Sequence, residues 1–392
     1  PIHINAPFNE PLYETIATMN DFRFIAEESD LQDTIDYENL ASQWNSAKKK
    51  MILVGVHSPN VALETLLDKV ADDPSVLVFT ETTSNLHNKR FVNSIDNLIF
   101  NLTKEEFTSL QPDILLTFGG MIVSKKIKKF LRDYSPKEHW HVNELRAFDT
   151  YQVLSKHLKI DSHSFFKHFC RLVDYDNKST YESTWTHNKQ RIREKHNRYI
   201  KTAPYSDLKV FEQVLKVIPD FSEVQFSNSA IIRYSQLFEM NSTITVFCNR
   251  GTSGIDGSTS TALGAAYATQ KPTTLITGDL SFFYDSNALW NNYIPLDVRI
   301  VIINNSGGGI FKIIPGPKKS TALKYFETPH CLTAEHLCIM FGFEYCTAHN
   351  LKSLKEEVAG FYDKSEKPKV LEVFTPSDLN DLVLKEYINN LK

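Results

Sequence analysis

Short apolar runs alternate with amphipathic stretches from about residue 48 onward. The apolar runs predict strands, because they are short and rich in β-branched residues, and the amphipathic stretches predict helices. In the first part of the chain the predicted strands are residues 51–56, 75–80, 114–118 and 139–142, and the predicted helices are residues 60–70 and 124–134. This alternation is typical of a parallel sheet with helices on both faces.

A second segment repeats the alternation further along the chain. Its predicted helices are residues 207–218, 230–238, 259–269 and 351–361, and its predicted strands are residues 223–226, 244–248, 273–277, 298–303 and 369–374. The polar and aromatic stretch at 161–205 is expected to be an exposed linking segment with one charged helix. The predicted fold class is therefore α/β, with two doubly wound, mostly parallel sheets: a central Rossmann-like domain at 31–160 and a second domain at 206–392.

Composition narrows the class of protein. With 392 residues, of which 42% are hydrophobic, the chain is long enough to bury more than one core. Its net charge of −4 argues against a dedicated nucleic-acid binder. No apolar run approaches the roughly 20 residues of a membrane helix, the first residues lack the features of a signal peptide, and the five cysteines form no disulfide-like pattern. We therefore expect a cytoplasmic protein.

An acid and an amide follow two neighbouring predicted strands. Asp279 lies two positions after the end of the strand at 273–277, and Asn305 lies 26 positions later, after the strand at 298–303. The carboxyl ends of parallel strands meet at one edge of a sheet, where open α/β folds bind ligands. Oxygen ligands of this kind suit Mg²⁺, which leaves positions for substrate phosphates. The pattern predicts a metal-bridged diphosphate, although each half alone is equally typical of an ordinary helix cap or turn.

Two flanking features favour an anion at the same edge. A helix predicted at 283–292 would direct its first backbone N–H groups toward a bound anion. The glycines at 307–309 allow a turn with positive φ that brings the backbone close to a ligand.

The surrounding residues resemble a known family. Gly278-Asp279 followed by Asn304-Asn305 is similar to the thiamine diphosphate (ThDP) motif, and the string Asn-Arg-Gly-Thr-Ser-Gly-Ile-Asp-Gly at 249–257, with Gly-Gly-Gly-Ile-Phe at 307–311, resembles the MenD family. Members of that family are ThDP-dependent 2-succinyl-5-enolpyruvyl-6-hydroxy-3-cyclohexene-1-carboxylate (SEPHCHC) synthases of menaquinone biosynthesis. The resemblance implies a transferase that decarboxylates 2-oxoglutarate and adds the succinyl unit to isochorismate.

The resemblance also implies a cofactor site. Its metal, Mg²⁺ or Mn²⁺, would be bound by the side chains of Asp279 and Asn305 and by the carbonyl of Gly307. Ile255 would be the bulky apolar residue that holds ThDP in its bent conformation, unless it is simply a core residue. The full set of implied cofactor-binding residues is Ser253, Gly254, Ile255, Gly278, Asp279, Leu280, Ser281, Asn305, Ser306, Gly307 and Gly308.

Substrates of this family are dianionic, so cations are expected near the cofactor. Arg250 follows a strand and can bind a carboxylate through two parallel hydrogen bonds, and Ser229 and Arg233 share a helix face. A surface or cap position is the alternative for Arg250, Arg233 and Ser229, simple core packing is the alternative for Ile310 and Phe311, and a solvated helix face explains the lysines equally well. The implied substrate-binding residues are Arg250, Arg233, Ser229, Lys125, Lys126, Ile310 and Phe311.

The first residues look like the end of a preceding domain. Residues 1–30 are expected to contain a closing strand and a Pro-rich linker. In the MenD family, a similar sequence lies at the end of an N-terminal pyrimidine-binding domain. The glutamate that activates ThDP lies in that domain, so no catalytic residue is assigned here, and the isolated fragment is expected to be inactive alone. The family further implies a homo-oligomer, a dimer or tetramer, with sites formed between subunits.

Two other functions remain open from the sequence. Another ThDP-dependent decarboxylase or carboligase would share the metal motif and differ in substrate, although the string at 249–257 and the two arginines favour the MenD family. The more distant alternative is a non-catalytic nucleotide-binding or assembly module with two Rossmann-like sheets. The glycine fingerprint of dinucleotide-binding domains does not occur in a suitable place.

Overall fold

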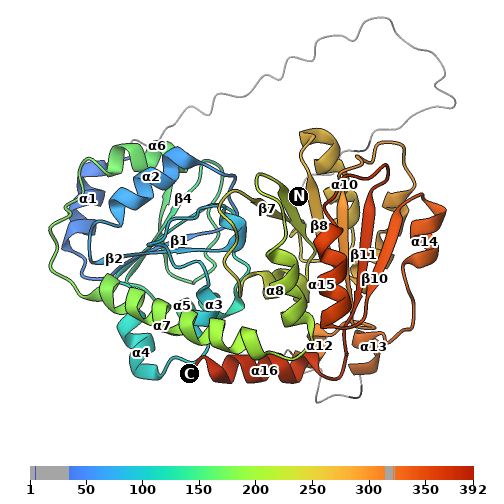
Figure 1. Ribbon diagram of the computed structural model, residues 1–392. Coiled ribbons are helices and arrows are strands. Elements are labelled where there is room, and N and C mark those ends of the chain that lie inside the picture. The colour runs from blue at the N-terminus through green and yellow to red at the C-terminus, as the bar shows by residue number, and fades with distance from the viewer. Residues whose placement is uncertain (1–4, 6–34, 314–320, 322) are drawn as a thin grey trace, which may run out of the picture. The chain divides into compact units, whose positions relative to one another are not determined.

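The first sheet of the computed structural model (Figure 1) lies in the N-terminal half of the described chain. It contains five parallel strands in the order β2-β1-β3-β4-β5. The structure describes residues 35–313 and 323–392, together with residues 5 and 321. Every position of β1, β2 and β3 is buried, as expected for parallel strands covered on both faces. The strands are β1 (Lys50–Val54), β2 (Val76–Thr80), β3 (Ile114–Phe118), β4 (Glu138–Val142) and β5 (Leu154–Leu158).

Seven short helices accompany this sheet among the described residues. Helices α2 and α5 and strands β1 to β4 lie within two residues of the predicted bounds, whereas α1, α3, α4 and β5 had no sequence prediction. The helices are α1 (Tyr37–Ser46), α2 (Val61–Val70), the 3-10 helix η1 (Thr82–Ser84), α3 (Ile95–Ile99), α4 (Lys104–Leu110), α5 (Lys125–Asp133) and α6 (Ser162–Phe169).

The start of α5 is anchored by a buried acid. Both carboxylate oxygens of Glu81 accept backbone hydrogen bonds, from the N–H of Val123 at 2.6 Å and of Ser124 at 2.7 Å. Burial raises the pKa of Glu81 to about 7, and these two hydrogen bonds oppose that shift because they favour the ionised form. Ser124 caps α5 by accepting a hydrogen bond from the N–H of Ile127. These contacts set the position of the lysines on the first turns of α5.

The second sheet contains six parallel strands in the order β10-β11-β9-β8-β6-β7. Strands β8 and β9 are neighbours, with Gly278 paired to Ile303, so the residues that follow them emerge at the same edge. The sequence did not predict β10, which follows a short apolar segment. The strands are β6 (Glu223–Phe226), β7 (Thr245–Cys248), β8 (Thr273–Gly278), β9 (Arg299–Asn304), β10 (Glu344–Ala348) and β11 (Lys369–Phe374).

Helices cover both faces of this second sheet. Helices α8 and α15 pack against each other on one face (Figure 1), while α10 and α14 pack on the other. The two parallel α/β sheets confirm the predicted fold class. The helices are α8 (Asp207–Leu215), α9 (Ala230–Ser235), α10 (Ser258–Thr269), α11 (Asp279–Tyr284), the 3-10 helix η2 (Ser286–Leu289), α12 (Ile310–Ile313), α13 (Leu323–Glu327), α14 (Glu335–Met340), α15 (Leu351–Gly360) and α16 (Asn380–Asn390).

The helix predicted at 283–292 is wrong in its bounds. Helix α11 instead begins at Asp279 and ends at Tyr284, and a separate 3-10 helix follows at Ser286–Leu289. The helix breaks at Asp285, whose carboxylate accepts hydrogen bonds from the backbone N–H and the hydroxyl of Ser260. The first turn of α11 therefore lies directly at the tip of β8.

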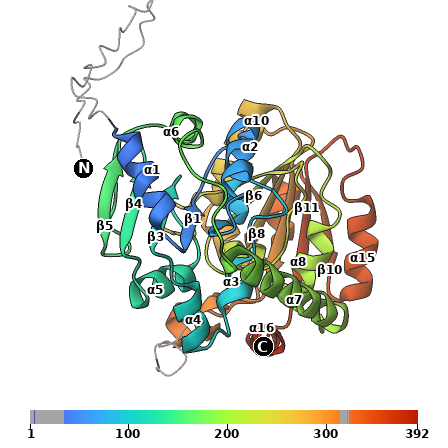
Figure 2. The same ribbon diagram turned by 90° about the vertical axis from the view of Figure 1, so that its left-hand side faces the viewer.

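The segment between the sheets is partly buried. Phe165, Phe166 and Phe169 of α6 belong to the core of the first sheet, and α7 (Tyr181–Thr202) buries Trp185. Helix α7 packs against α3 and also against α16, so it contacts elements of both sheets (Figure 2). The domain bounds predicted from the sequence remain a prediction. The closing strand and linker predicted at residues 1–30 lie outside the described residues, apart from residue 5.

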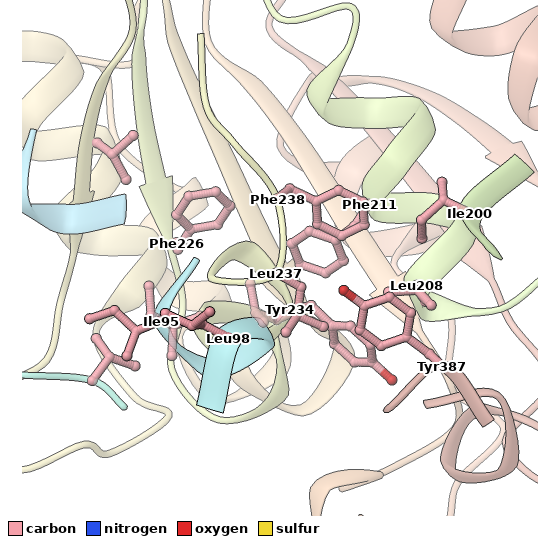
Figure 3. Packing of buried hydrophobic residues seen from close by; sticks show 14 of the residues in the cluster. Ile95, Leu98, Ile200, Leu208, Phe211, Phe226, Tyr234, Leu237, Phe238 and Tyr387 are labelled. Atoms are coloured by element: carbon pink, nitrogen blue, oxygen red, sulfur yellow. The ribbon is translucent and has the colours of Figure 1, made fainter. Parts of the chain in front are cut away.

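One apolar core continues from the first sheet into the second. Phe211 of α8 stacks on Tyr234, with ring centroids 5.4 Å apart, and the same cluster includes Ile95 and Leu98 of α3 (Figure 3). Asn85 adds polar contacts: its side chain donates to the carbonyl of Val246 and accepts from the N–H of Val246, as a neighbouring strand would. These contacts join α3 and the residue after η1 to α8 and β7 of the second sheet. No helix in the described part of the chain is long and apolar enough to span a membrane.

Candidate functional site

A cavity of about 660 Å³ opens at the carboxyl edge of the second sheet. Elements of both halves of the chain contribute to its walls, from Met121 and α5 on one side to the tips of β8 and β9 on the other. All but two of the candidate residues predicted from the sequence line this cavity. They are Ser229, Arg233, Arg250, Ser253, Gly254, Ile255, Gly278, Asp279, Leu280, Ser281, Asn305, Gly307, Gly308, Ile310, Phe311 and Lys125.

The two exceptions are Lys126 and Ser306. The ammonium of Lys126 lies 5.5 Å from the ring centroid of Phe100, away from the cavity. Lys128, which the sequence analysis did not select, lines the cavity instead. Ser306 is exposed, and its carbonyl accepts a hydrogen bond from the N–H of His330.

Asp279 is only 3% exposed at the tip of β8. Its Oδ1 accepts a hydrogen bond from the N–H of Leu280 at 2.7 Å, and its Oδ2 accepts one from the N–H of Gly307 at 2.9 Å. The carboxylate therefore bridges the loops that follow β8 and β9. A carboxylate offers about four lone-pair positions, so acceptor capacity remains for a cation.

His330 is a second group beside this carboxylate. Its Nε2 lies 3.3 Å from Asp279 Oδ2 without well-aligned hydrogen-bond geometry. Its Nδ1 accepts a hydrogen bond from the N–H of Leu332, which places the ring proton on Nε2, facing Asp279. The neighbouring carboxylate raises the pKa of His330 above its usual value.

Asn305 presents an unsatisfied acceptor. It is 9% exposed, and its Nδ2 donates a hydrogen bond to Asp207 Oδ2 at 2.9 Å. Its Oδ1 is buried and has no hydrogen-bond partner among the described residues. A buried carbonyl oxygen without a partner is costly, and a bound cation would satisfy it.

Asp207 is buried at the start of α8 and holds this amide. Burial, and to a smaller extent the charge of Asp279, raise the pKa of Asp207 to about 6, and hydrogen bonds from Thr375, Asn305 and Asn380 oppose the shift because they favour the ionised form. Asp207 also lines the cavity. Its position could not be recognised in the sequence, because an Asp in the first turn of a helix is common for electrostatic reasons alone.

The loop after β9 requires glycine at one position. Gly307 has a φ of +146°, and a Cβ there would lie 2.5 Å from the carbonyl oxygen of Glu327. The N–H of Gly308 donates to that same carbonyl at 2.6 Å. The carbonyl of Gly307 accepts a hydrogen bond from the N–H of Gly309 at 3.0 Å and keeps a second lone pair.

Four cationic side chains line the cavity. Arg250 donates from Nη1 to Asn228 Oδ1 at 2.8 Å, and the Nε atoms of Arg250 and Arg233 are buried with no hydrogen-bond partner in the described part of the chain. Burial, and then the charge of Arg250, lower the pKa of Arg233. Lys125 and Lys128 add further positive charge. Guanidinium N–H groups that lack partners are suited to a bound carboxylate.

Asn228 holds the loop that carries Arg250. Its Nδ2 donates to the carbonyls of Asn249 and Gly254, at 2.5 and 2.6 Å, while its Oδ1 accepts from Arg250. Nearby, Ser281 donates its hydroxyl to the carbonyl of Ile255 at 2.5 Å. These hydrogen bonds therefore fix the loop up to and including the carbonyl of Ile255, a residue that lines the cavity.

Several residues with a strained backbone conformation lie at the same edge of the sheet. Three non-glycine residues that line the cavity have positive φ, namely Ser229 at 65°, Ser253 at 70° and Thr328 at 48°, and Ser306 in the loop after β9 adds a fourth at 64°. Such conformations cost on the order of 1–3 kcal/mol each and are found preferentially at functional sites. Their concentration around one cavity supports a binding role for this edge of the sheet.

Comparisons with known proteins agree with this picture. A family described as "Middle domain of thiamine pyrophosphate" matches residues 19–224, and "Thiamine pyrophosphate enzyme, C-terminal TPP binding domain" matches residues 228–373. The whole chain is 49% identical to a 2-succinyl-5-enolpyruvyl-6-hydroxy-3-cyclohexene-1-carboxylate synthase of Flavobacterium psychrophilum and covers 71% of it. It is also 49% identical to the synthase of Christiangramia forsetii, covering 69% of that protein. For Porphyromonas gingivalis the identity is 34% over 99% of the chain and 69% of the relative.

Proposed function

The chain belongs to the 2-succinyl-5-enolpyruvyl-6-hydroxy-3-cyclohexene-1-carboxylate (SEPHCHC) synthase family, and we propose that it carries the diphosphate- and metal-binding part of this enzyme's site. The reaction is a ThDP-dependent carboligation in menaquinone biosynthesis. It decarboxylates 2-oxoglutarate and adds the remaining succinyl unit to isochorismate.

One observation carries this proposal. At the tips of adjacent strands, the buried carboxylate of Asp279 and the unsatisfied Oδ1 of Asn305 line one cavity with the Gly307 loop. These oxygen donors fit a hard divalent cation such as Mg²⁺ or Mn²⁺ and leave coordination positions for phosphate oxygens. Asp279, Asn305 and the Gly307 carbonyl would hold the metal, and Leu280, Ser281 and Gly308 would border the diphosphate.

Each part of the cavity has a role in this proposal. When bound, ThDP supplies the electron sink for decarboxylation. Arg250 and Arg233 bind substrate carboxylates, and Lys125 and Lys128 add long-range attraction for dianionic substrates. Ile255, Ile310 and Phe311 provide apolar walls that exclude water and orient the bound molecules.

We propose two further properties of the protein. The active form is a homo-oligomer, a dimer or tetramer, as the resemblance to this family implies, and a second subunit would cover the exposed side of the cavity near Tyr284. The location is cytoplasmic, which suits five cysteines that are all unpaired.

A nucleotide-binding module is the main alternative from another class. In open α/β sheets such a ligand lies between the loops at the switch point of the strand order, which in the first, Rossmann-like sheet are the loops after β1 and β3. Those two loops bond to each other instead: the N–H of Gly120 donates to the carbonyl of Val56 at 2.7 Å. A Cβ on Gly55 would lie only 2.0 Å from the Gly120 oxygen. Backbone contact therefore leaves no room for a nucleotide there.

Calorimetry on the 392-residue chain tests the proposed function. ThDP is titrated into the protein with Mg²⁺ and, in a parallel experiment, with excess EDTA. We expect weak binding that depends on the metal. A nucleotide-binding module would produce no heat with ThDP in either buffer, and this result would contradict the proposal.

Arg250→Ala is expected to weaken dicarboxylate recognition and to leave the cofactor bound. A charge-assisted hydrogen bond contributes about 1.5–3 kcal/mol, so the Kd for 2-oxoglutarate should rise about 10- to 100-fold. Binding is measured with ThDP and Mg²⁺ present. Arg191→Ala, on the exposed face of α7, is the matched control.

A parallel titration with pyruvate shows which carboxylate of 2-oxoglutarate Arg250 binds, because pyruvate has the oxoacid group but lacks the second carboxylate. If Arg250 binds that carboxylate, the variant loses affinity for 2-oxoglutarate and changes little toward pyruvate. Equal losses for both acids would instead favour a different ThDP-dependent decarboxylase, with Arg250 near the shared oxoacid group.

A further inference from the structure

We propose that Asp207 is a positioning residue for the metal site: its carboxylate fixes the orientation of the Asn305 amide so that Oδ1, and not the NH₂ group, faces the cation. This inference rests on the proposed function and extends it to a residue that the ThDP motif does not contain. Asp207 and Asn305 are 98 positions apart in the sequence and meet only in the folded chain.

Hydrogen-bond geometry decides which way the amide points. Both oxygens of Asp207 accept hydrogen bonds, Oδ1 from Thr375 and Asn380 and Oδ2 from Asn305. The Asn305 amide therefore turns its donor, Nδ2, toward Asp207, at 2.9 Å. The opposite rotamer would place two oxygens in contact and lose this hydrogen bond. Since Oδ1 is thereby directed away from Asp207, it remains a free acceptor, and it has no partner among the described residues.

Asp207 is itself held rigidly from its other side. Its Oδ1 accepts hydrogen bonds from the Thr375 hydroxyl at 2.6 Å and from Asn380 Nδ2 at 2.9 Å. The N–H of Asp207 donates to Asn380 Oδ1 at 2.8 Å. Oδ1 thus accepts two hydrogen bonds, and Oδ2 accepts the hydrogen bond from Asn305. Groups that orient a metal ligand in this way typically change metal affinity 10- to 100-fold when they are replaced.

This arrangement predicts the result of an isosteric change. In Asp207→Asn, the new amide oxygen stays where Thr375 and Asn380 donate, so its NH₂ group faces Asn305. Asn305 then turns its own oxygen toward residue 207 and presents NH₂ to the metal site. An NH₂ group cannot ligate a cation, so metal affinity falls although no proposed ligand has been removed.

Exchanging the two side chains should reverse the loss. In the double variant Asp207→Asn, Asn305→Asp, the residue 207 amide donates to the new carboxylate, whose second oxygen faces the metal. The total charge equals that of the unmodified chain. A role of Asp207 in stability or overall charge alone gives no reason for such recovery.

The test measures Mn²⁺ and ThDP binding to the full 392-residue chain, by electron paramagnetic resonance of free Mn²⁺ and by calorimetry. We expect D207N to weaken Mn²⁺-dependent binding about 10- to 100-fold, and the exchanged pair to recover most of the affinity. Asp285→Asn is the matched control, because Asp285 is also a buried, hydrogen-bonded carboxylate of this domain but does not line the cavity. Circular dichroism checks that each variant is folded.

The outcomes are distinct. Unchanged binding by D207N, or a folded double variant that recovers nothing, would overturn the positioning role alone. If D207N does not fold, the double variant decides: affinity near that of the unmodified chain supports the role. Absence of Mn²⁺-dependent binding by the unmodified chain would overturn the proposed function and the inference together.

Discussion

Replacing Asp279 with alanine is expected to abolish metal-dependent binding of ThDP. The carboxylate is the one charged side chain among the three proposed metal ligands, and it also holds the loop after β9 through the N–H of Gly307. Its loss removes both the main electrostatic attraction for a divalent cation and the link between the two strand tips. Calorimetry with ThDP and Mg²⁺ measures the effect.

Two further variants separate these contributions. Asp279→Asn retains the size and one acceptor oxygen but not the charge, so it should preserve the fold and still bind the metal much more weakly. Asp297→Ala removes an exposed acid of the same domain and should leave binding unchanged. If the alanine variant at 279 binds ThDP as tightly as the unmodified chain, the ligand assignment is wrong.

Lys50→Met is expected to lower the free energy of unfolding by about 3–5 kcal/mol, the typical effect of breaking a buried ion pair. Lys50 and Asp73 are 0% and 1% exposed, and Lys50 Nζ lies 2.7 Å from Asp73 Oδ2. Burial lowers the pKa of Lys50, and the hydrogen bond to Asp73 opposes that shift. Removing the ammonium leaves a buried carboxylate without its counter-charge.

Urea denaturation followed by circular dichroism measures this loss of stability. Lys129→Met is the control, because Lys129 pairs with Asp133 on the surface, where an ion pair contributes less than about 1 kcal/mol. In the double variant Lys50→Met, Asp73→Asn the remaining charge is absent, so part of the stability should return. Similar losses for Lys50→Met and Lys129→Met would show that the buried pair has no special role.

The sequence predicted the cores of both sheets because buried parallel strands are short, continuous apolar runs. It failed at β5, whose residues Leu-Ser-Lys-His-Leu are mostly polar. The reason is physical: only Leu158 of β5 is fully buried, so most of the strand needs no apolar side chains, whereas the other edge strand, β2, is buried throughout. Helices α3 and α4, of five and seven residues, are too short to show a helical period. The chain's first 34 residues contribute nothing to this comparison, since only residue 5 among them is described.

For the candidate site, position along the chain was informative wherever a residue directly follows a strand. Asp279, Asn305 and Arg250 each follow a predicted strand, and all three line the one cavity. The sequence was less informative about which face of a helix a residue lies on. Two lysines next to each other on α5 point in different directions, because successive helical residues are rotated by about 100°, and Lys125 rather than Lys126 reaches the cavity.

By itself, the sequence determined the fold class, the family and the strand tips that carry the metal motif, because these depend on local periodicity and on residues close together along the chain. Only the tertiary structure decided which distant groups complete the site. Asp207, Lys128 and His330 have no local signal, and each gains its place from packing between elements far apart in sequence. The orientation of a single amide, Asn305, depends on such a contact.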